Sequence, residues 1–399
     1  MAVTTHSRSR DAATEKPSLF YRAEFRQIIY QIIVLAGLVF VGWWVVNNVA
    51  ENLQRQNIAS GFDFLGRTSG FDISQTLIPY SNVSTYGRAF WVGLLNTLLV
   101  SVVGIFFATV IGFIVGIARL SSNWLIARLA TVYIETVRNV PLLLQLLFWY
   151  FAVLKNLPPP RQSLPIVGGG FLNVRGLYLP APVAEPGFGI VVIAFLLGIA
   201  ASIGLYVWAR QRQMQTGQQF PVFRWSLGLV LGLPLVAYFL LGSPMYWEYP
   251  VLRGFNFQGG LVVQPEFLAL LLGLSIYTAS FIAEIVRAGI LGVPKGQKEA
   301  AKALGLTDGQ MLRLVVIPQA ARIIIPPLTS QYLNLTKNSS LAVAIGYPDF
   351  VSVFTGTVLN QTGQAVEVIA MTMAVYLTIS LLTSAFMNWF NRHMALVER

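Results

Sequence analysis

The chain has 399 residues, of which 55% are apolar and only 11% are charged, so its solvent is a lipid bilayer. It has no cysteine, and its two histidines, His6 and His393, lie near the ends. This excludes disulfides, cysteine or histidine metal sites and histidine-based triads from the apolar interior, while the net charge of +11 indicates membrane topology rather than nucleic-acid binding.

Eight apolar stretches are long enough to cross about 30 Å of hydrocarbon at about 1.5 Å per residue. The chain is therefore predicted to be an all-α integral membrane protein with about eight transmembrane helices. The predicted spans are residues 28–49, 93–118, 130–154, 187–209, 225–242, 265–290, 323–348 and 366–390. No small-residue cleavage site follows the first span, so we expect a retained anchor helix and not a signal peptide.

Lysine and arginine residues are distributed unequally between the alternate sides of these spans. With the N-terminus inside, 18 of them lie on the inner side, seven lie on the outer side, and Arg138 and Lys337 fall within spans. Cytoplasmic loops hold the excess of Lys and Arg in membrane proteins. We therefore expect both the N-terminal arm, 1–27, and the tail, 392–399, to be cytoplasmic.

Two segments rich in Gly, Pro, Ser and Asn are expected to be outer loops. The first, 50–88, is predicted to be periplasmic, and the second, 155–186, precedes a helix pair with a polar connection. Residues 155–264 thus form an insertion with two extra helices. It separates a first core part, 89–154, from a second, 265–391.

Residues 295–318 predict a helix–glycine–helix hairpin between two spans. Good helix formers run to Leu304, Gly305 is placed to end the helix in a left-handed conformation, and Thr307 or Asp308 can cap a second helix before Pro318. Ala300 and Ala301 would let another backbone approach closely. The alternatives are an amphipathic linker on the membrane surface and a docking element for a second protein.

The segment 299–318 resembles the signature loop of permease subunits in ABC importers. That loop reads Glu-Ala-Ala, three residues, Gly, nine residues, then apolar-x-apolar-Pro, and here Glu299, Gly305 and Pro318 occupy its fixed positions. Flanking residues are similar to the polar amino-acid permeases, the histidine/glutamine-type family. They include Tyr277, Glu284, Arg287, Gly296, Gln297, Gln319, Asn334 and Lys337, and the resemblance covers 89–154 and 265–391.

The resemblance implies a five-helix type I ABC importer permease core with one added N-terminal helix and the inserted helix pair. Arg138-Asn139-Val140-Pro141, where many members have Arg-Gly-Thr-Pro, is most like the Q-type subunit of the general L-amino-acid permeases. The implied function is uptake of L-amino acids across the bacterial inner membrane. The implied partners are a related, non-identical permease subunit, an ABC ATPase dimer docked on Glu299, Ala300, Ala301, Gly305 and Pro318, and a periplasmic amino-acid-binding protein.

The chain has no Gly-x-x-x-x-Gly-Lys-Ser/Thr phosphate loop. ATP is therefore expected on the partner ATPase, with no cofactor in this chain. Polar residues within spans are candidates for the solute path, namely Lys337, Asn334, Ser275 and Thr278. Lys337 could meet a substrate carboxylate or pair with a neighbouring helix, and the hydroxyls of Ser275 and Thr278 could bond to their own helix.

Two i, i+3 pairs, Glu284 with Arg287 and Glu135 with Arg138, predict structural ion pairs within a helix.

Two other classes of membrane protein are weighed against a permease subunit. A secondary transporter would need a carboxylate in mid-span, and an intramembrane aspartyl protease would need two buried aspartates. The five aspartates, Asp11, Asp63, Asp72, Asp308 and Asp349, are expected outside the spans or at their rims. We therefore predict no catalytic site and no metal site.

Overall fold

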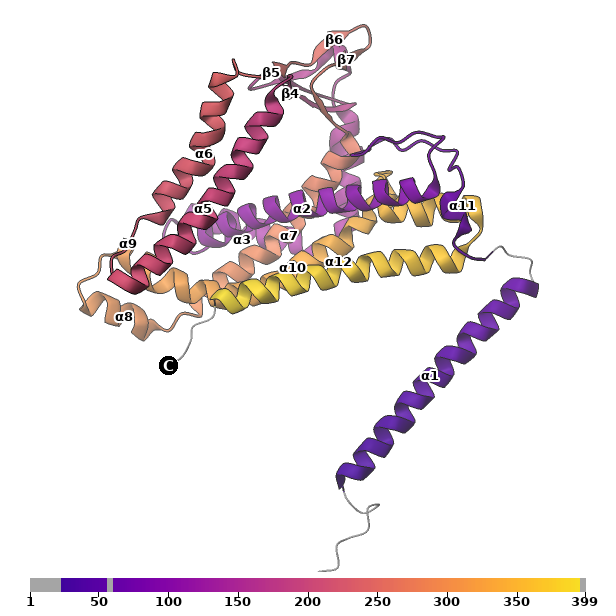
Figure 1. Cartoon of the computed structure of the whole chain (residues 1–399), viewed down its shortest axis with the longest axis horizontal. Coiled ribbons are helices and arrows are strands. Elements are labelled where there is room, and N and C mark those ends of the chain that lie inside the picture. The colour runs from indigo at the N-terminus through magenta and orange to yellow at the C-terminus, as the bar shows by residue number, and fades with distance from the viewer. Residues whose placement is uncertain (1–22, 56–59, 395–399) are drawn as a thin grey trace, which may run out of the picture.

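The computed structural model describes residues 23–55 and 60–394, and in this part the chain is mainly helical (Figure 1). Seven helices are long and apolar enough to cross a membrane, or eight if one bent pair counts as a span. The long helices are α1 (Ala23–Arg55), α2 (Tyr86–Ala118), α5 (Phe188–Thr216), α6 (Val222–Leu240), α7 (Pro265–Leu291), α10 (Ile317–Asn338) and α12 (Ala365–Met394). Most of the predicted arm 1–27 and tail 392–399 lies outside the described residues.

Shorter elements connect these helices. The short helices are α3 (Trp124–Asn139), α4 (Leu142–Leu147), α8 (Lys295–Ala303), α9 (Asp308–Met311) and α11 (Leu359–Thr362), with π-helical segments at Phe148–Val153, Leu312–Val316 and Val351–Val358. Four 3₁₀ segments complete the bundle and its outer loops: Asp63–Gly66, Leu154–Asn156, Pro160–Gln162 and Ser339–Ile345. The mainly helical class predicted from the apolar stretches is confirmed.

The third predicted span, 130–154, is not one straight helix. The helices Trp124–Asn139 and Leu142–Asn156 meet at an angle of 106°. Proline disfavours the helical region for the residue before it, and Val140, which precedes Pro141, is extended at φ −98° and ψ 127°. The side-chain amide of Gln145 donates to the carbonyls of Val137 and Val140, both at 2.9 Å, so the break leaves these two groups satisfied.

The seventh predicted span, 323–348, belongs to a longer helical run from Asp308 to Ile345. Pro318, expected to end the hairpin, instead lies inside this run, at the start of α10 and just after the π-helical segment Leu312–Val316. Gly346, left-handed at φ 77°, ends the run. A second helical segment, 351–362, then leads to α12.

The insertion also contains strands that the sequence did not predict. They are β1 (Leu164–Ile166), β2 (Gly170–Asn173), β3 (Gly176–Leu179), β4 (Ala181–Ala184), β5 (Met245–Glu248), β6 (Val251–Arg253), β7 (Asn256–Gln258) and β8 (Leu261–Val263). They form one antiparallel sheet in the order β1-β2-β3-β8 and two strand pairs, β4-β5 and β6-β7. The pairing of β3 with β8 closes the insertion on itself.

The main packing contact joins α2 and α7. Gly104, Ala108, Gly112 and Gly116 recur every four residues and form one small-residue ridge along α2. A Cβ on Gly112 would lie 2.6 Å from the Cβ of Ile282, and one on Gly116 would lie 2.7 Å from the carbonyl oxygen of Ala283. Helices that share a membrane associate through such close packing, since lipid gives no hydrophobic drive between them.

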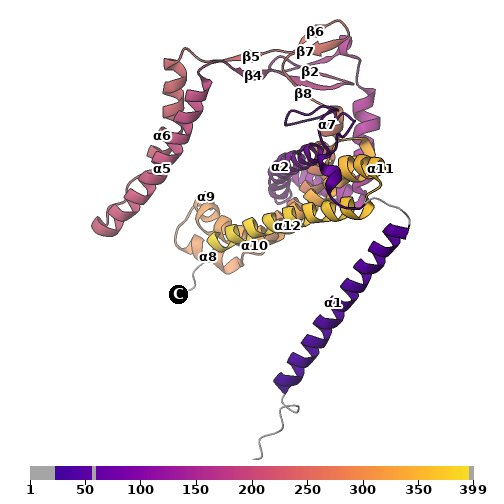
Figure 2. The same cartoon turned by 45° about the vertical axis from the view of Figure 1, so that its right-hand side comes forward.

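We call α2, α3, α4, α7, α10 and α12, with the segments between them, the bundle. Figures 1 and 2 show the α5–α6 pair standing away from the bundle, connected through β4 and β5. The sheets lie at one end of α7 and the α8–α9 hairpin lies at its other end. Helix α1 also lies apart from the bundle in both views.

Candidate functional site

The α8–α9 hairpin is an exposed element at the end of α7. Glu299, Ala300 and Ala303 are exposed, Leu304 is 81% exposed, and Ala301 is buried against the rest of the hairpin. The hairpin thus presents small side chains and one large apolar one outward. Of the five residues expected to dock a partner, the structure places Glu299, Ala300 and Gly305 on this surface, and it half-buries Pro318.

Gly305 gives the hairpin its bend. It is left-handed at φ 76°, its N–H donates to the Lys302 carbonyl at 2.9 Å, and the N–H of Leu306 donates to the Ala301 carbonyl at 3.2 Å. These two bonds make a Schellman motif, which needs a residue that tolerates positive φ. No atom lies within 4 Å of the position a Cβ would take. Backbone conformation, and not space, therefore requires glycine here.

Thr307 starts the second helix. Its hydroxyl accepts from the N–H of Gln310 at 3.4 Å, and the side chain of Gln310 accepts from the N–H of Thr307 at 3.0 Å. This capping box decides between the two caps considered, Thr307 and Asp308, in favour of Thr307. Asp308 instead forms an exposed ion pair with Lys302 across the bend, at 3.5 Å.

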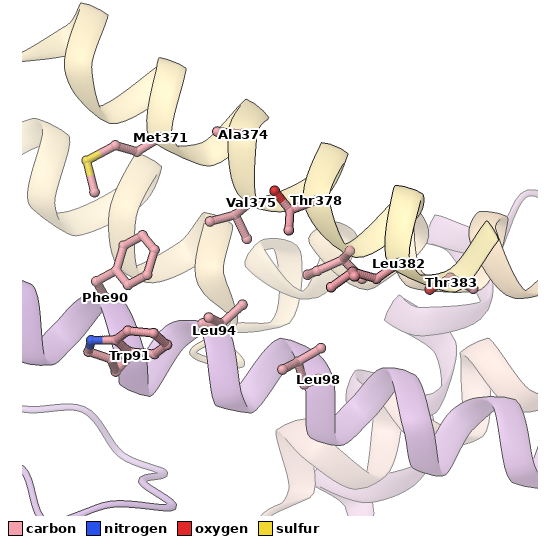
Figure 3. A pocket seen from close by; sticks show the side chains of 11 residues that line it. Phe90, Trp91, Leu94, Leu98, Met371, Ala374, Val375, Thr378, Leu382 and Thr383 are labelled. Carbon is pink, nitrogen blue, oxygen red and sulfur yellow. The ribbon is translucent and has the colours of Figure 1, made fainter. Parts of the chain in front are cut away.

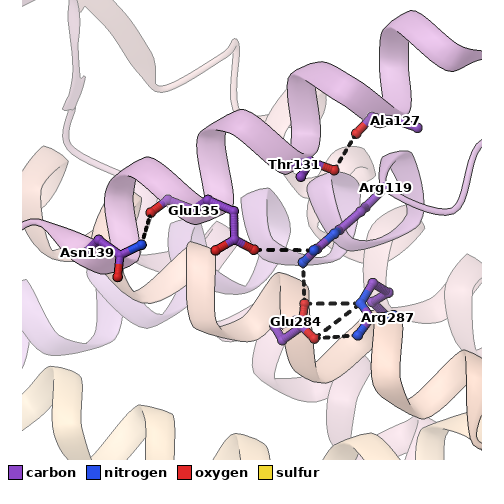
Figure 4. A network of polar contacts seen from close by, with 7 residues as sticks. All are labelled: Arg119, Ala127, Thr131, Glu135, Asn139, Glu284 and Arg287. Carbon is purple, nitrogen blue, oxygen red and sulfur yellow. Dashed lines mark hydrogen bonds and ion pairs between the residues drawn. The ribbon is translucent and has the colours of Figure 1, made fainter.

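A charged network ties three helices of the bundle together close to the hairpin (Figure 4). The Arg119 guanidinium, just after α2, donates to Glu284 on α7 at 2.5 Å and to Glu135 on α3 at 3.3 Å. Arg287 also contacts Glu284, at 2.6 Å, so the expected Glu284–Arg287 pair is present. Glu284 is thus shared between two arginines.

The predicted pair of Glu135 with Arg138 is wrong. Glu135 reaches Arg119, and the guanidinium of Arg138 lies 5.0 Å from the ring centre of Phe281 on α7. Both side chains are drawn to groups on neighbouring elements, which an i, i+3 rule cannot foresee. The cation–π contact of Arg138 places a cation beside the polar pocket described next.

The four candidate solute residues do not gather in one place. Thr278 and Asn334 line a pocket of about 270 Å³ between α7 and α10, with Tyr277, Phe281, Gln331 and Asn338. Lys337 lines a separate pocket of about 450 Å³, beside Tyr376 and Ser380 of α12. Ser275 is buried between helices and donates to the Gly104 carbonyl of α2 at 3.4 Å, so the expected bond to its own helix is replaced by one between helices.

Lys337 is exposed, and no carboxylate of the described residues lies within 4 Å of its ammonium group. The alternative of a lysine paired with a carboxylate of a neighbouring helix is therefore not realised in the described part of the chain. Three hydroxyl side chains also line its pocket, those of Ser340, Tyr376 and Ser380. The hydroxyls of Ser340 and Tyr376 already donate to the Lys337 carbonyl and to Asp349, so the exposed ammonium group is the donor that a carboxylate could use.

Asp349 lies outside the candidate spans, between the run that ends at Ile345 and α12, as the sequence predicted. Its side chain is fully buried, which the sequence did not predict, and it accepts from the N–H of Ser352 at 2.8 Å and from the hydroxyl of Tyr376 at 3.2 Å. The spacing Asp-x-x-Ser is a helix-cap signal that could have located it before the π-helical segment Val351–Val358. Among the described residues, no group of three His, Cys, Asp or Glu side chains could hold a metal ion.

The chain matches known transport proteins over most of its length. Residues 108–396 match the family model described as the inner membrane component of binding-protein-dependent transport systems. The chain is 56% identical to the general L-amino acid transport system permease protein AapQ of Rhizobium johnstonii, over 96% of this chain and 95% of that one. It is 54% identical to the putative amino-acid ABC transporter permease protein YhdX of Escherichia coli, over 98% and 100%.

A third relative is more distant. The glutamate/glutamine/aspartate/asparagine transport system permease protein BztB of Rhodobacter capsulatus is 42% identical over 96% of each chain. All three alignments include the α5–α6 insertion and the segment before α2, since each covers at least 96% of this chain. The chain belongs to the family of inner membrane components of binding-protein-dependent transport systems.

Proposed function

We propose that this membrane-embedded permease subunit of an amino-acid ABC importer is driven through its α8–α9 hairpin, which a cytoplasmic ATPase grips. The observation that carries the proposal is the hairpin itself, an exposed pair of short helices held at a fixed bend by Gly305 and by the capping box of Thr307. The outward side chains of Ala300 and Ala303 leave room for a partner backbone, and Leu304 offers an apolar anchor.

The hairpin is well placed to move the solute path. Helix α7 leads into α8 through only three residues, Gly292 to Pro294, and α9 continues into α10 without a break. Helices α7 and α10 are the two walls of the pocket that holds Thr278 and Asn334. A displacement of the hairpin therefore changes the separation of these walls, which is the coupling that alternating access requires.

The substrates are L-amino acids, in line with the names of the relatives. In our proposal Lys337 binds the α-carboxylate that all of them share, because its ammonium group is exposed to a pocket and has no carboxylate partner in the described residues. Side-chain selection is then left to a separate periplasmic amino-acid-binding protein. ATP is bound by the ATPase, and this chain needs no cofactor of its own and has no catalytic site.

The proposed assembly places the chain in the bacterial inner membrane with both termini in the cytoplasm. The excess of Lys and Arg on the hairpin side, 18 against seven, supports this orientation. A related, non-identical permease subunit and an ABC ATPase dimer complete the transporter. The sheets β1 to β8 then lie on the periplasmic side, where the binding protein would deliver its amino acid.

The experiment compares two glycines of the hairpin. Gly305→Ala forces an L-residue into a left-handed conformation at a cost of about 1 kcal/mol, while Gly309, four residues later, has a free Cβ position and an ordinary φ. We expect Gly305→Val, and to a smaller extent Gly305→Ala, to reduce both ATPase co-purification and amino-acid uptake. Gly309→Ala should leave both unchanged. Normal uptake and normal ATPase recovery with Gly305→Val would overturn the proposal.

A further inference from the structure

An apolar groove of about 560 Å³ runs along the bundle between α2 and α12 (Figure 3). Its wall on α2 carries Phe90, Trp91 and Leu94, and its wall on α12 is a stripe at helical spacing that includes Met371, Val375 and Leu382. Trp91 and Leu382 are 56% and 66% exposed. No element of the described chain covers this face, although it is as apolar as a helix interface.

Helix α1 is apolar, and no other part of the described chain packs against it. The most apolar 18-residue window of its span, Arg26–Val49, has a mean hydropathy of 2.2, and none of that window is buried. Figures 1 and 2 show it leaving the bundle beside the turn between α11 and α12. The molecule thus has one uncovered groove and one helix without a neighbour.

The chain that follows α1 is fixed at one end of the groove. The N–H of Gly61 donates to the carboxylate of Glu367, in the first turn of α12, at 2.6 Å. Phe64 is fully buried, with its ring centre 6.0 Å from that of Tyr86, in the first turn of α2. Gly61 lies six positions after Arg55, so the two residues are at most about 20 Å apart. The C-terminal end of α1 is therefore held beside the end of the groove at which α2 and α12 begin.

Helix α1 and the groove each have a small residue at about the same depth in the membrane. Gly42 is seven residues before Val49, the end of the α1 span, and Ala374 is seven residues after Glu367, which places each about 10 Å into the membrane. Gly42 has no atom within 4 Å of its Cβ position, and Ala374 is exposed in the groove. Such small residues allow the close backbone approach on which helix association in lipid depends.

We propose that α1 packs in the groove between α2 and α12 of its own chain, antiparallel to both. The short connection favours α1 of the same chain over α1 of a second subunit, because its end cannot leave the groove by more than the length of six residues. The small residues Gly42 and Ala374, at matching depths, would allow the close packing that favours a helix over lipid in the groove. The packed helix would seal the outer face of the bundle beside the fully buried Phe354, which contacts the groove residue Phe90.

Because the sequence has no cysteine, disulfide trapping can use pairs of introduced cysteines without removing any native ones. In the complete transporter in membranes, Ala374→Cys is combined with a cysteine at each of four consecutive positions of α1, Val39 to Gly42, so that every face of the helix is sampled. A protease site between α5 and α6, at residues 217–221, splits the chain after oxidation. We expect at least one pair to hold the two fragments together on a non-reducing gel, at the mass of one chain.

The matched control is Met373→Cys, one residue away on α12, which is exposed at the same depth but faces the Lys337 pocket. It should join the fragments at least tenfold less. A second set, Thr378→Cys with residues 35–38, repeats the measurement one turn deeper, and uptake by each variant reports correct assembly. Three results overturn the proposal: products with the mass of two chains, equal joining with Met373→Cys, or no joining in either set while uptake is retained.

Discussion

Replacing Gly116 by alanine should loosen the contact between α2 and α7. An added Cβ would lie 2.7 Å from the carbonyl oxygen of Ala283 and 2.8 Å from the Cβ of Val286. Ordinary contacts between such atoms are about 3.5 Å, so the helices must separate by roughly 0.7 Å. The nearer atom belongs to a backbone, which cannot move aside by changing a rotamer.

The magnitude is the difference of two opposing effects. Overpacking a close contact costs about 1–3 kcal/mol, and alanine gains up to about 1 kcal/mol over glycine inside a helix. The net loss of stability for Gly116→Ala is therefore about 1–2 kcal/mol. Gly204→Ala, in α5, meets no atom within 4 Å and should be neutral or slightly stabilising.

Thermal unfolding of the purified transporter, followed by intrinsic fluorescence, measures both variants under one condition. We expect the Tm of Gly116→Ala to fall by several degrees relative to the unmodified chain, while the Tm of Gly204→Ala stays level or rises. Equal Tm values for the two variants would show that α2 and α7 do not approach as closely as the structure has them. The small-residue ridge would then not be what joins these helices.

Three further predictions concern charge and coupling. Arg119→Met removes a charged hydrogen bond at 2.5 Å between Arg119 and Glu284 of α7, and it should lower the free energy of unfolding by about 2 kcal/mol in chemical denaturation. The control Arg55→Met, which removes an exposed pair with Glu51, should change nothing measurable. Equal effects of the two substitutions would refute a structural role for the network. Lys337→Met should raise the KM for uptake about tenfold or more with ATPase coupling intact, and an unchanged KM would remove Lys337 from carboxylate binding. The chain reconstituted alone in vesicles should not accumulate amino acid against a gradient, and concentrative uptake there would point to ion coupling.

Hydropathy located the long helices because the length of an apolar stretch is a local property. It did not detect the 106° bend at Pro141, since the residues on both sides are apolar and a hydropathy window carries no information on direction. A proline after Val140 is a local signal that could have predicted the bend. The pairing of β3 with β8 spans more than eighty residues of sequence, so no local pattern marks it. The hairpins β1-β2, β2-β3 and β6-β7 are local, and their short turns are signals that could have predicted them.

In the hairpin and the ion network, too, the sequence predicts contacts between near neighbours in the chain but not contacts between distant segments. The bend at Gly305 and the cap at Thr307 are local, and the sequence predicted the bend and left the cap between Thr307 and Asp308. The pair of Glu284 with Arg287 is equally local. Arg119 lies 165 residues from Glu284, and only the packing of α2 on α7 brings them together. Sequence spacing therefore found one of the three ion pairs of the network and assigned Glu135 to the wrong arginine.

The position of Arg119 also decides which helices must move together. Close glycine contacts at Gly112 and Gly116 fix α2 to α7, and Arg119, directly after α2, holds Glu284 of α7 and Glu135 of α3. In the proposed mechanism, a push on the α8–α9 hairpin would act on α2, α3 and α7 as one body. Helix α10 continues from the hairpin and packs closely on α7 at Gly289 and Ile324, so the polar pocket is where we expect α7 and α10 to separate.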